Sequence, residues 1–262
     1  MYKVKGDAML IDTHVHLNNK DLYQKIEEVI NDAKKAKVLK FFVVGYDLET
    51  SQLAIEIASK YENCFAIIGF HPTEIKNYKD NEYNWLDENA SNPHVVAIGE
   101  IGYDFHWDVT TKEEQEKAFV RQIEIAKKHK LPISIHSRDA IELTYQTLKE
   151  NGASIVGGVM HSYSGSKEMA QKFINLNFYL GISGPVTFKN GRVMKEVVET
   201  VELKYLLSET DSPYLTPHPY RGKENGPKYI PLIVEEISKI KNIEIEVVEK
   251  QIEENVKNLF RV

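Results

Sequence analysis

The sequence predicts a single-domain α/β protein with the (β/α)8 architecture of a TIM-like barrel. Eight short, apolar and largely β-branched runs occur along the chain, and longer stretches with a helical pattern of apolar residues separate nearly all of them. Eight strand–helix alternations in 262 residues match this fold in number and in length. No Ser/Pro/Gly-rich linker and no low-complexity tract divides the chain, so we expect one domain over residues 1–262.

The expected strands are apolar throughout, as strands are when helices cover both faces of a parallel sheet. They span approximately 9–16, 39–46, 64–70, 95–102, 132–137, 156–161, 178–183 and 205–210. An open doubly wound sheet is the alternative, because it also alternates strands with helices. No expected strand is followed by the G-x-G-x-x-G fingerprint of dinucleotide-binding sheets, which favours the barrel.

Helices are predicted where apolar residues recur at about 3.6-residue spacing. Residues 21–37 show this pattern, and residues 112–130 show it again and end just before Pro132. Residues 231–259 are expected to form two closing helices that separate near Asn242.

The bulk properties exclude some classes of function. The formal charge is −6, from 33 basic and 39 acidic residues, which argues against broad non-specific adhesion to nucleic acid. A phosphodiester substrate remains open, because bound cations can invert the field of an acidic site. No window reaches the roughly 18 apolar residues of a membrane span, and the N-terminal segment lacks a secretory apolar core. With one cysteine and therefore no internal disulfide, we expect a cytoplasmic protein with no membrane association and no obligate protein partner.

Ionisable residues stand where several of the apolar runs end. The group is His14, His16, Glu100, His136, His161 and Asp211. The first two lie two residues apart, so in a strand they share one face, although two polar residues that finish an edge strand would look the same. An ionisable group in an apolar strand costs several kcal/mol unless it is paired or bound to metal. Five strand ends of this kind indicate one shared cation site at the carboxyl edge of the barrel.

Six candidate ligands exceed the three protein ligands that a single catalytic zinc usually takes. The surplus predicts two divalent cations about 3.5–4 Å apart, as in two-metal hydrolases. Nitrogen and oxygen ligands accept Zn²⁺, Mn²⁺, Co²⁺ or Mg²⁺, and the number of histidines favours a transition metal over Mg²⁺.

We expect Glu100 to bridge the two cations, because a carboxylate has two oxygens. The histidine pair of the first strand, together with Asp211 of the eighth, would hold one cation, since these strands are neighbours in a closed barrel. His136 and His161 would hold the other. A water shared by the metals would be acidified, and Asp211 is our candidate general base for it.

These residues lie in segments that resemble the TatD-type deoxyribonuclease family of metal-dependent hydrolases, within the wider amidohydrolase-like barrels. The segments are DTHVHL (12–17), GFHP (69–72), IGEIGYD (98–104), HSRDA (136–140), HSYSG (161–165), ETDSPYL (209–215) and RGKENGP (221–227). The resemblance runs from about residue 9 to the C-terminus. It implies a TIM-like barrel, a dinuclear site on the six residues named above, and hydrolysis of phosphodiester bonds in DNA. Residues 1–8 precede the usual start of the family, which leaves Met9 as an alternative beginning.

Four further residues are candidates for substrate contact. His71 ends the third strand and would face the metals, with a core histidine as the alternative. Arg138 and Arg221 can each offer a planar fork to a phosphate oxygen, and a surface ion pair is the alternative for either. Asp104 follows Glu100 by four residues and would orient a ligand or capture a loop amide, unless it serves only in a turn.

Two more groups lie near the expected site. Glu209 precedes Asp211 by two residues, so strand alternation would place it on the same inward face, where it can support a ligand. Tyr103, Phe105 and Trp107 follow the fourth strand and are candidates to stack on a base. A lid packed onto the barrel is the alternative for this aromatic group.

Three hypotheses follow for function. The first is a dinuclear phosphodiesterase that acts on DNA by trimming ends or short single strands. The second keeps the metals and changes the substrate to an amide, lactone or ester, including an aminoacyl ester on tRNA, since fold does not determine function. A basic rim with Arg138 and Arg221 turned inward would favour the first, and a smaller, more neutral pocket the second. The third is a non-catalytic binding module that keeps the ligands as a scaffold. The chain has neither a G-x-S-x-G nucleophile elbow nor a P-loop.

Overall fold

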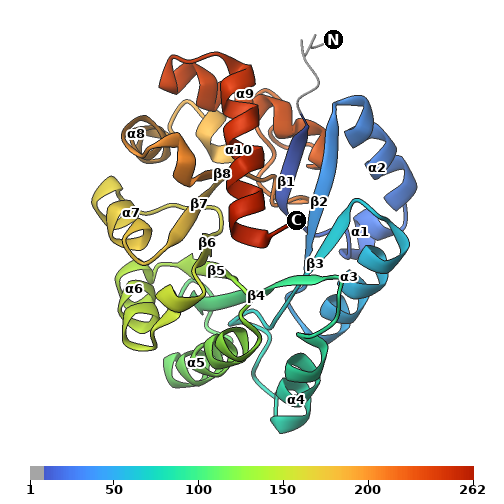
Figure 1. Cartoon of the computed structure of the whole chain (residues 1–262), viewed down its shortest axis with the longest axis vertical. Coiled ribbons are helices and arrows are strands. Elements are labelled where there is room, and N and C mark those ends of the chain that lie inside the picture. Colours follow the sequence, from blue (N-terminus) through green and yellow to red (C-terminus); the bar gives the residue numbers. More distant parts are fainter. Residues whose placement is uncertain (1–8) are drawn as a thin grey trace.

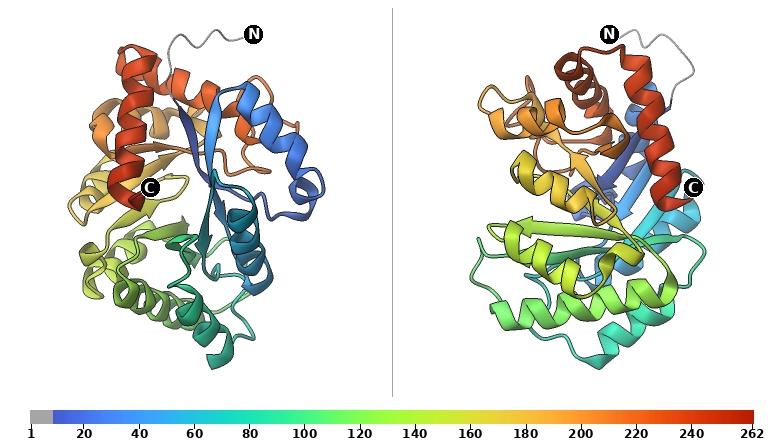
Figure 2. Two further views of the ribbon diagram at one scale, coloured as in Figure 1. Left: turned by 45° about the vertical axis from the view of Figure 1, so that its right-hand side comes forward. Right: turned by 60° about the vertical axis from the view of Figure 1, so that its left-hand side comes forward.

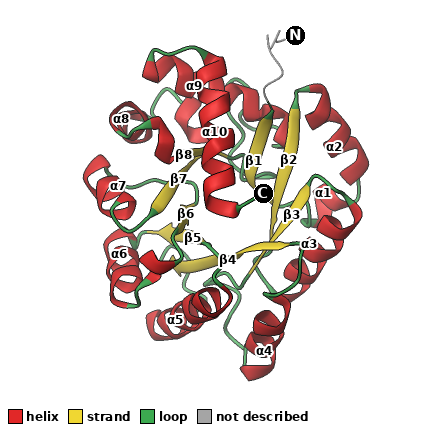
Figure 3. Ribbon diagram, viewed as in Figure 1, coloured by secondary structure: helices red, strands yellow, loops and turns green. Residues whose placement is uncertain are grey.

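The computed structural model describes residues 9–262 and confirms the (β/α)8 fold class. Eight parallel strands form one sheet in the order β1 to β8, and helices surround it (Figures 1 and 3). The strands are β1 (Leu10–Val15), β2 (Val38–Val44), β3 (Cys64–Ile68), β4 (Val95–Asp104), β5 (Ile133–Arg138), β6 (Gly158–Met160), β7 (Phe178–Ile182) and β8 (Leu206–Ser208). Each lies within about two residues of its predicted range. The alternative start at Met9 concerns residues 1–8, which lie outside the described residues.

The barrel closes between β1 and β8 through the chain that follows β8. Val15 forms an isolated parallel bridge with Ser212, and the Asp211 amide donates a hydrogen bond of 2.9 Å to the His14 carbonyl oxygen. Inside the wall, the Ser208 hydroxyl donates to a carbonyl oxygen of β1 at 2.9 Å. The closure therefore fixes the backbone of Asp211 against the backbone of the first histidine pair.

The helices occupy the predicted regions, with one difference. They are α1 (Lys20–Tyr23), α2 (Ile26–Lys35), α3 (Leu48–Lys60), α4 (Asp80–Asn89), α5 (Lys112–His129), α6 (Ile141–Glu150), α7 (Lys167–Ile174), α8 (Arg192–Thr200), α9 (Ile230–Lys241) and α10 (Ile245–Phe260). Short 3₁₀ turns are η1 (Ala153–Ile155), η2 (Gly184–Thr187), η3 (Leu203–Tyr205) and η4 (Pro227–Tyr229). No helix within residues 9–262 is both long and apolar enough to cross a bilayer.

The single helix expected over 21–37 is wrong, because the helix is broken at Lys25. That residue has φ −129° and ψ 29°, outside the helical region, and its side chain pairs with Glu224 at 2.6 Å. Leu22 in α1 and Ile26 in α2 are both buried, so the apolar spacing continues across the break. Periodicity could not reveal the break for that reason.

The last helix covers the amino ends of the strands and leaves the carboxyl ends to the loops. In Figures 1 and 2, α10 runs beside β1 and β8. Asn255 of α10 donates to the carbonyl oxygens of Leu203 and Leu206, just before and at the start of β8. Phe260 packs on Phe42 of β2, with ring centroids 4.4 Å apart. The helix α10 therefore packs on the start of β8 and on β2, and contributes no residue to the predicted site.

The fourth strand, β4, has a β-bulge at Glu100, one of the predicted metal ligands. Along β4 and β5, Ile98 pairs with Ile133 and Ile101 pairs with Ile135, so three steps on β4 match two on β5. Such a bulge re-aims side chains, and Glu100 lies within it. Every residue of β4 is buried. The bulge therefore re-aims the ionisable side chain of Glu100 within a strand that is buried over its whole length.

We expect Gly102→Ala to destabilise the barrel, because this position has φ +142° and an added Cβ would lie 2.0 Å from the His136 carbonyl oxygen. Backbone strain and overpacking together predict a loss of about 2 kcal/mol or more in the free energy of unfolding, measurable in urea. Gly226→Ala is the matched control: its Cβ would meet nothing within 4 Å, and stability should change by less than about 0.5 kcal/mol. Equal stability of the two variants would contradict this account.

Candidate metal centre

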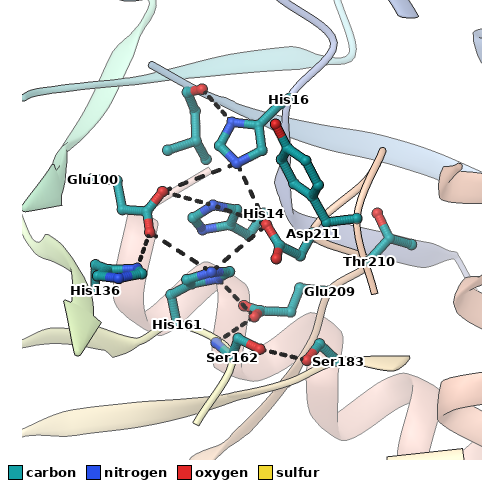
Figure 4. A network of polar contacts seen from close by, with 12 residues as sticks. His14, His16, Glu100, His136, His161, Ser162, Ser183, Glu209, Thr210 and Asp211 are labelled. Atoms are coloured by element: carbon teal, nitrogen blue, oxygen red, sulfur yellow. Dashed lines mark hydrogen bonds and ion pairs between the residues drawn. The ribbon is translucent and has the colours of Figure 1, made fainter. Parts of the chain in front are cut away.

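The six residues predicted as ligands meet at the carboxyl ends of the strands (Figure 4). They come from β1 and the residue after it, from β4 and β5, and from the turns after β6 and β8. Five of the six line a pocket of about 780 Å³, and His14 lies beneath its floor, 1% exposed. The structure thus brings together side chains from across some two hundred positions of sequence.

His14, His16 and Asp211 form one group whose ligand atoms lie within 4.8 Å of one another. The Nε2 atom of His16 lies 3.4 Å from Asp211 Oδ1 and 4.0 Å from Glu100 Oε2. Its other ring nitrogen, Nδ1, lies 2.9 Å from the Val44 carbonyl oxygen, so Nδ1 donates there and Nε2 is left to face the centre.

His161 lies against the same group. Its ring stacks on that of His14 at a centroid distance of 3.5 Å, and its Nε2 lies 3.8 Å from Glu100 Oε1 and 3.7 Å from Asp211 Oδ1. Its Nδ1 lies 2.8 Å from Glu209 Oε1, and Glu209 also accepts a hydrogen bond from the Ser162 amide. Glu209 is fully buried and lies on the inward face, where strand alternation predicts it.

His136 does not join His161 in one group. Its ring centroid is 6.5 Å from that of His161, and the structure instead groups it with His71 and Glu100. His136 Nδ1 lies 2.7 Å from Glu100 Oε1 and its Nε2 lies 2.9 Å from Asp104 Oδ2. Two carboxylates therefore hold the ring, and they turn it towards the side of the pocket that carries Asp104.

Two observations indicate that His14, Glu100 and Asp211 could hold a cation. Both ring nitrogens of His14 are buried without a hydrogen-bond partner, which is costly for an imidazole. Its Nε2 faces Glu100 Oε2 at 3.5 Å and Asp211 Oδ1 at 3.9 Å, too far for hydrogen bonds. Ligand atoms about 2.0–2.2 Å from one cation lie roughly 3–4 Å from each other, which matches these separations.

The carboxylates and histidines at the floor of the pocket shift one another's pKa values. Burial alone would raise the pKa of Glu100, but His161, His136 and His14 outweigh burial and hold that pKa well below its usual value. Burial would likewise lower the pKa of His161, but Glu209 and the other carboxylates raise it to about 10. Glu100 and His161 therefore stabilise one another's charged forms, and a cation that binds His161 would displace its proton.

His71 behaves differently from the other histidines of the pocket. Burial, with His136 nearby, lowers the pKa of His71 to about 3, so the ring is neutral near pH 7. Its Nδ1 lies 2.8 Å from the Thr73 hydroxyl. A neutral imidazole that lines the pocket can accept a hydrogen bond or a cation, which makes His71 a possible ligand as well as a substrate contact.

Asp12 is a supporting residue that the candidate set left out. It is fully buried; its Oδ1 accepts from the Thr210 amide at 2.9 Å and its Oδ2 accepts from the Thr210 hydroxyl at 2.5 Å. Burial raises the pKa of Asp12 to about 7. These bonds tie β1 to the turn that carries Asp211. Like Glu100, Asp12 is an acid in an otherwise largely apolar strand, Leu10–Val15, and this position in the sequence could have identified it.

The predicted substrate contacts divide into two groups. His71, Asp104 and Arg138 line the pocket, and Asp104 both faces His136 and accepts from the amides of the following loop. Arg221 is not among the lining residues; its guanidinium lies over the Phe188 ring, 4.2 Å from the centroid.

The aromatic candidates divide in the same way. Tyr103 is fully buried and its hydroxyl contacts the Thr147 hydroxyl, so Tyr103 does not reach the mouth. Phe105 lines an adjoining hollow, and Trp107 lines the pocket itself. Tyr46 and Tyr214 also line the pocket. Both come from loops in the structure, and Tyr46 is the last residue of the range 39–46 that was predicted as the second strand.

Comparison with known proteins places this geometry among metal-dependent hydrolases. The profile of the family described as TatD related DNase matches residues 11–261. A Bacillus subtilis protein named as the uncharacterized metal-dependent hydrolase YabD is 45% identical over 97% of this chain and 100% of its own. The 3'-5' ssDNA/RNA exonuclease TatD of Klebsiella pneumoniae is 31% identical over 97% and 98%. The crystal structure of YjjV, a TatD homologue from Escherichia coli, superposes with a TM-score of 0.92 at 27% identity, covering 97% and 98%.

We expect divalent cations to stabilise the fold through this centre. At one hundred times its dissociation constant, a cation that binds only the folded state adds about 2.7 kcal/mol, which corresponds to a rise of about 5–10 °C in Tm. Thermal unfolding of EDTA-treated protein, with and without Zn²⁺ or Mn²⁺, measures this rise.

The variant His14→Ala should lose most of that rise, because His14 belongs to two of the three candidate groups. His94→Ala, which removes a histidine remote from the pocket lining, should keep it. An undiminished rise in His14→Ala, together with unchanged metal content by elemental analysis, would show that the cation binds elsewhere.

Proposed function

Because the chain belongs to the TatD family of metal-dependent hydrolases, we propose that it hydrolyses phosphodiester bonds of DNA with two divalent cations held at this centre. The observation that carries the proposal is the convergence of six side chains that can ligate metals, five of them lining one open pocket and His14 buried beneath it. The exonuclease name of the Klebsiella relative supports the choice of a nucleic acid as the substrate.

The chain would hold the first cation with His14, His16 and Asp211, whose ligand atoms form one close group. Glu100 is the proposed bridge, because its two oxygens face different histidines: Oε2 faces the pair of the first strand, and Oε1 faces the later two. Divalent cations would supply the charge that acidifies water and that stabilises the transition state of phosphate-ester hydrolysis. The nitrogen-rich donor set favours a transition metal.

The remaining roles fall to side chains around the floor. Asp211 Oδ1 is our candidate to take a proton from the attacking water, because it lies on the pocket floor and the nearby histidines, which lower its pKa, keep it ionised. Arg138 is exposed on the pocket wall and forms no ion pair with another residue of 9–262, and its planar fork would bind a phosphate oxygen. Glu209 and Asp104 orient His161 and His136.

A second candidate function is hydrolysis of a neutral ester, lactone or amide, including an aminoacyl ester on tRNA. It is favoured by the charge of the pocket: Arg138 is the one Lys or Arg among the described residues that line it, whereas four carboxylates do so. The basic rim expected of a phosphodiesterase is therefore only partly present. A panel of lactones and aryl esters, assayed beside DNA with the same metal-loaded protein, separates the two.

Metal-loaded protein should cleave labelled single-stranded DNA, and EDTA should abolish the cleavage. Gel electrophoresis of the products would follow the reaction, with Mn²⁺, Mg²⁺ and Zn²⁺ tested in parallel. Protein that elemental analysis shows to be metal-loaded, but that cleaves no DNA under any of these conditions, would refute the proposal.

Asp211→Asn should lower kcat for DNA by about 10²-fold or more, since it removes the proposed proton acceptor and one ligand charge. Asp108→Asn is the matched control, because this exposed carboxylate lies outside the pocket lining and should leave kcat unchanged. Thermal unfolding of both variants tests that folding is retained. A kcat for Asp211→Asn within a few-fold of the unaltered protein would assign the base elsewhere.

A further inference from the structure

Large apolar side chains are exposed at the mouth of the pocket. Trp107 is 55% exposed, Tyr214 is 54% exposed and Leu215 is 37% exposed, and all three line the pocket whose floor is the metal centre. Exposed aromatic side chains are ordinarily scattered singly over a surface. Their collection around one polar floor indicates a ligand with flat apolar faces and an anionic or polar link between them.

The two aromatic residues are anchored to opposite ends of the ligand set. Tyr214 lies next to His16, with ring centroids 6.2 Å apart. The backbone amide of Trp107 donates to Asp104 Oδ1 at 3.2 Å, and the other oxygen of Asp104 lies 2.9 Å from His136. Figure 4 shows His16 and His136 on either side of Glu100. One aromatic residue is therefore anchored near each end of the ligand set, Tyr214 beside His16 and Trp107 through its backbone amide beside His136.

Hydrogen bonds hold the backbone of both residues. The Tyr214 amide donates to the Asp211 carbonyl oxygen at 2.8 Å, and the Tyr214 carbonyl oxygen accepts from the Asn225 amide group. Asn225 is buried and also donates to the Thr210 carbonyl oxygen. These bonds connect Tyr214 to the same turn that carries the candidate ligand Asp211, so its position is set by the geometry of the site.

We propose that Trp107 and Tyr214 are two base-stacking positions, one on each side of the phosphodiester that is cleaved. This proposal rests on the proposed function and narrows its substrate to strands in which both flanking nucleotides are unpaired. Stacking needs an exposed base face, and it tolerates any base because every base has one. With Arg138 as the one Lys or Arg among the described lining residues, stacking also supplies affinity that phosphate contacts cannot.

Tryptophan fluorescence tests the first position directly, because the chain holds two tryptophans, Trp85 and Trp107. In Zn²⁺-loaded Trp85→Phe protein, the emission comes from Trp107 alone. The probe is a phosphorothioate-linked hexathymidylate, which resists hydrolysis, and the comparison is a strand of equal length and linkage that carries no bases. We expect saturable quenching by the thymidylate and at least 10-fold weaker binding of the abasic strand. No quenching, or equal affinity for both strands, would overturn the proposal.

Substitutions test both positions in the hydrolytic reaction. Trp107→Ala and Tyr214→Ala should each raise KM for oligothymidylate about 5-fold or more while KM for the abasic strand stays unchanged. Trp107→Phe and Tyr214→Phe keep an aromatic face and should restore most of the loss. Val109→Ala is the control, because Val109 is an exposed apolar residue of the same loop that does not line the pocket.

The outcomes separate this proposal from the proposed function. Equal KM changes on the thymidylate and abasic strands would mean that the aromatic residues only shape the pocket, and the stacking proposal would fall. Cleavage of the abasic strand as efficient as that of thymidylate would leave the phosphodiesterase standing without stacking sites. Base-dependent quenching in a protein that cleaves neither strand would support the two stacking positions and contradict the proposed phosphodiesterase activity.

Discussion

The buried carboxylate of Glu100 is the constraint on which the rest of the site depends. It is 4% exposed, and ring nitrogens from four histidines lie within 4.0 Å of its oxygens; two come from β1 and the residue after it, one from β5 and one from the turn after β6. An isolated carboxylate at this depth would cost several kcal/mol, and so would the buried imidazoles without acceptors. The groups are tolerable only together, since removing one leaves its partners uncompensated.

The barrel satisfies this constraint by supporting each ligand from behind. Glu209 holds the ring of His161, and the Val44 carbonyl oxygen holds the ring of His16. Asp12 ties the first strand to Thr210 and so sets the backbone that precedes Asp211. Supporting contacts of this kind orient ligands and raise their basicity. The polar cluster is costly, and the buried apolar core formed by the strands and the surrounding helices helps to offset that cost.

The sequence predicted those parts of the molecule in which apolar and polar residues recur at the regular spacing of a strand or a helix. Strand alternation and apolar runs located all eight strands and placed the candidate ligands at strand ends, and Glu209 lies on its predicted inward face. Features that do not follow the spacing of apolar residues could not be predicted from the sequence. The helix break at Lys25 preserves the apolar spacing, and Arg221 turns onto Phe188 through a contact between two loops.

The orientation of His136 could not be predicted for a related reason. It depends on two hydrogen bonds at once, to Glu100 from within the sheet and to Asp104 at the end of the same strand. The alternation of residues along a strand predicts which face of the sheet His136 occupies. Its side-chain rotamer depends on Glu100 and Asp104, which only the folded structure brings next to it. Asp12 differs from these cases, because its signal was present in the strand and only its partner, Thr210, was hidden.

The charge of the pocket gives the metals a second role under the proposed function. Four carboxylates line it against Arg138 and the histidines, of which His161 has its pKa raised to about 10, so without bound metal the pocket has no excess of positive charge to attract a phosphodiester. Two divalent cations would carry as much positive charge as those carboxylates carry negative, and Arg138 would then decide the sign. Affinity for a polyanion and the capacity to cleave it would therefore appear together when metal binds. An acidic protein can in this way act on nucleic acid without adhering to it indiscriminately, because the attraction is confined to the point of cleavage.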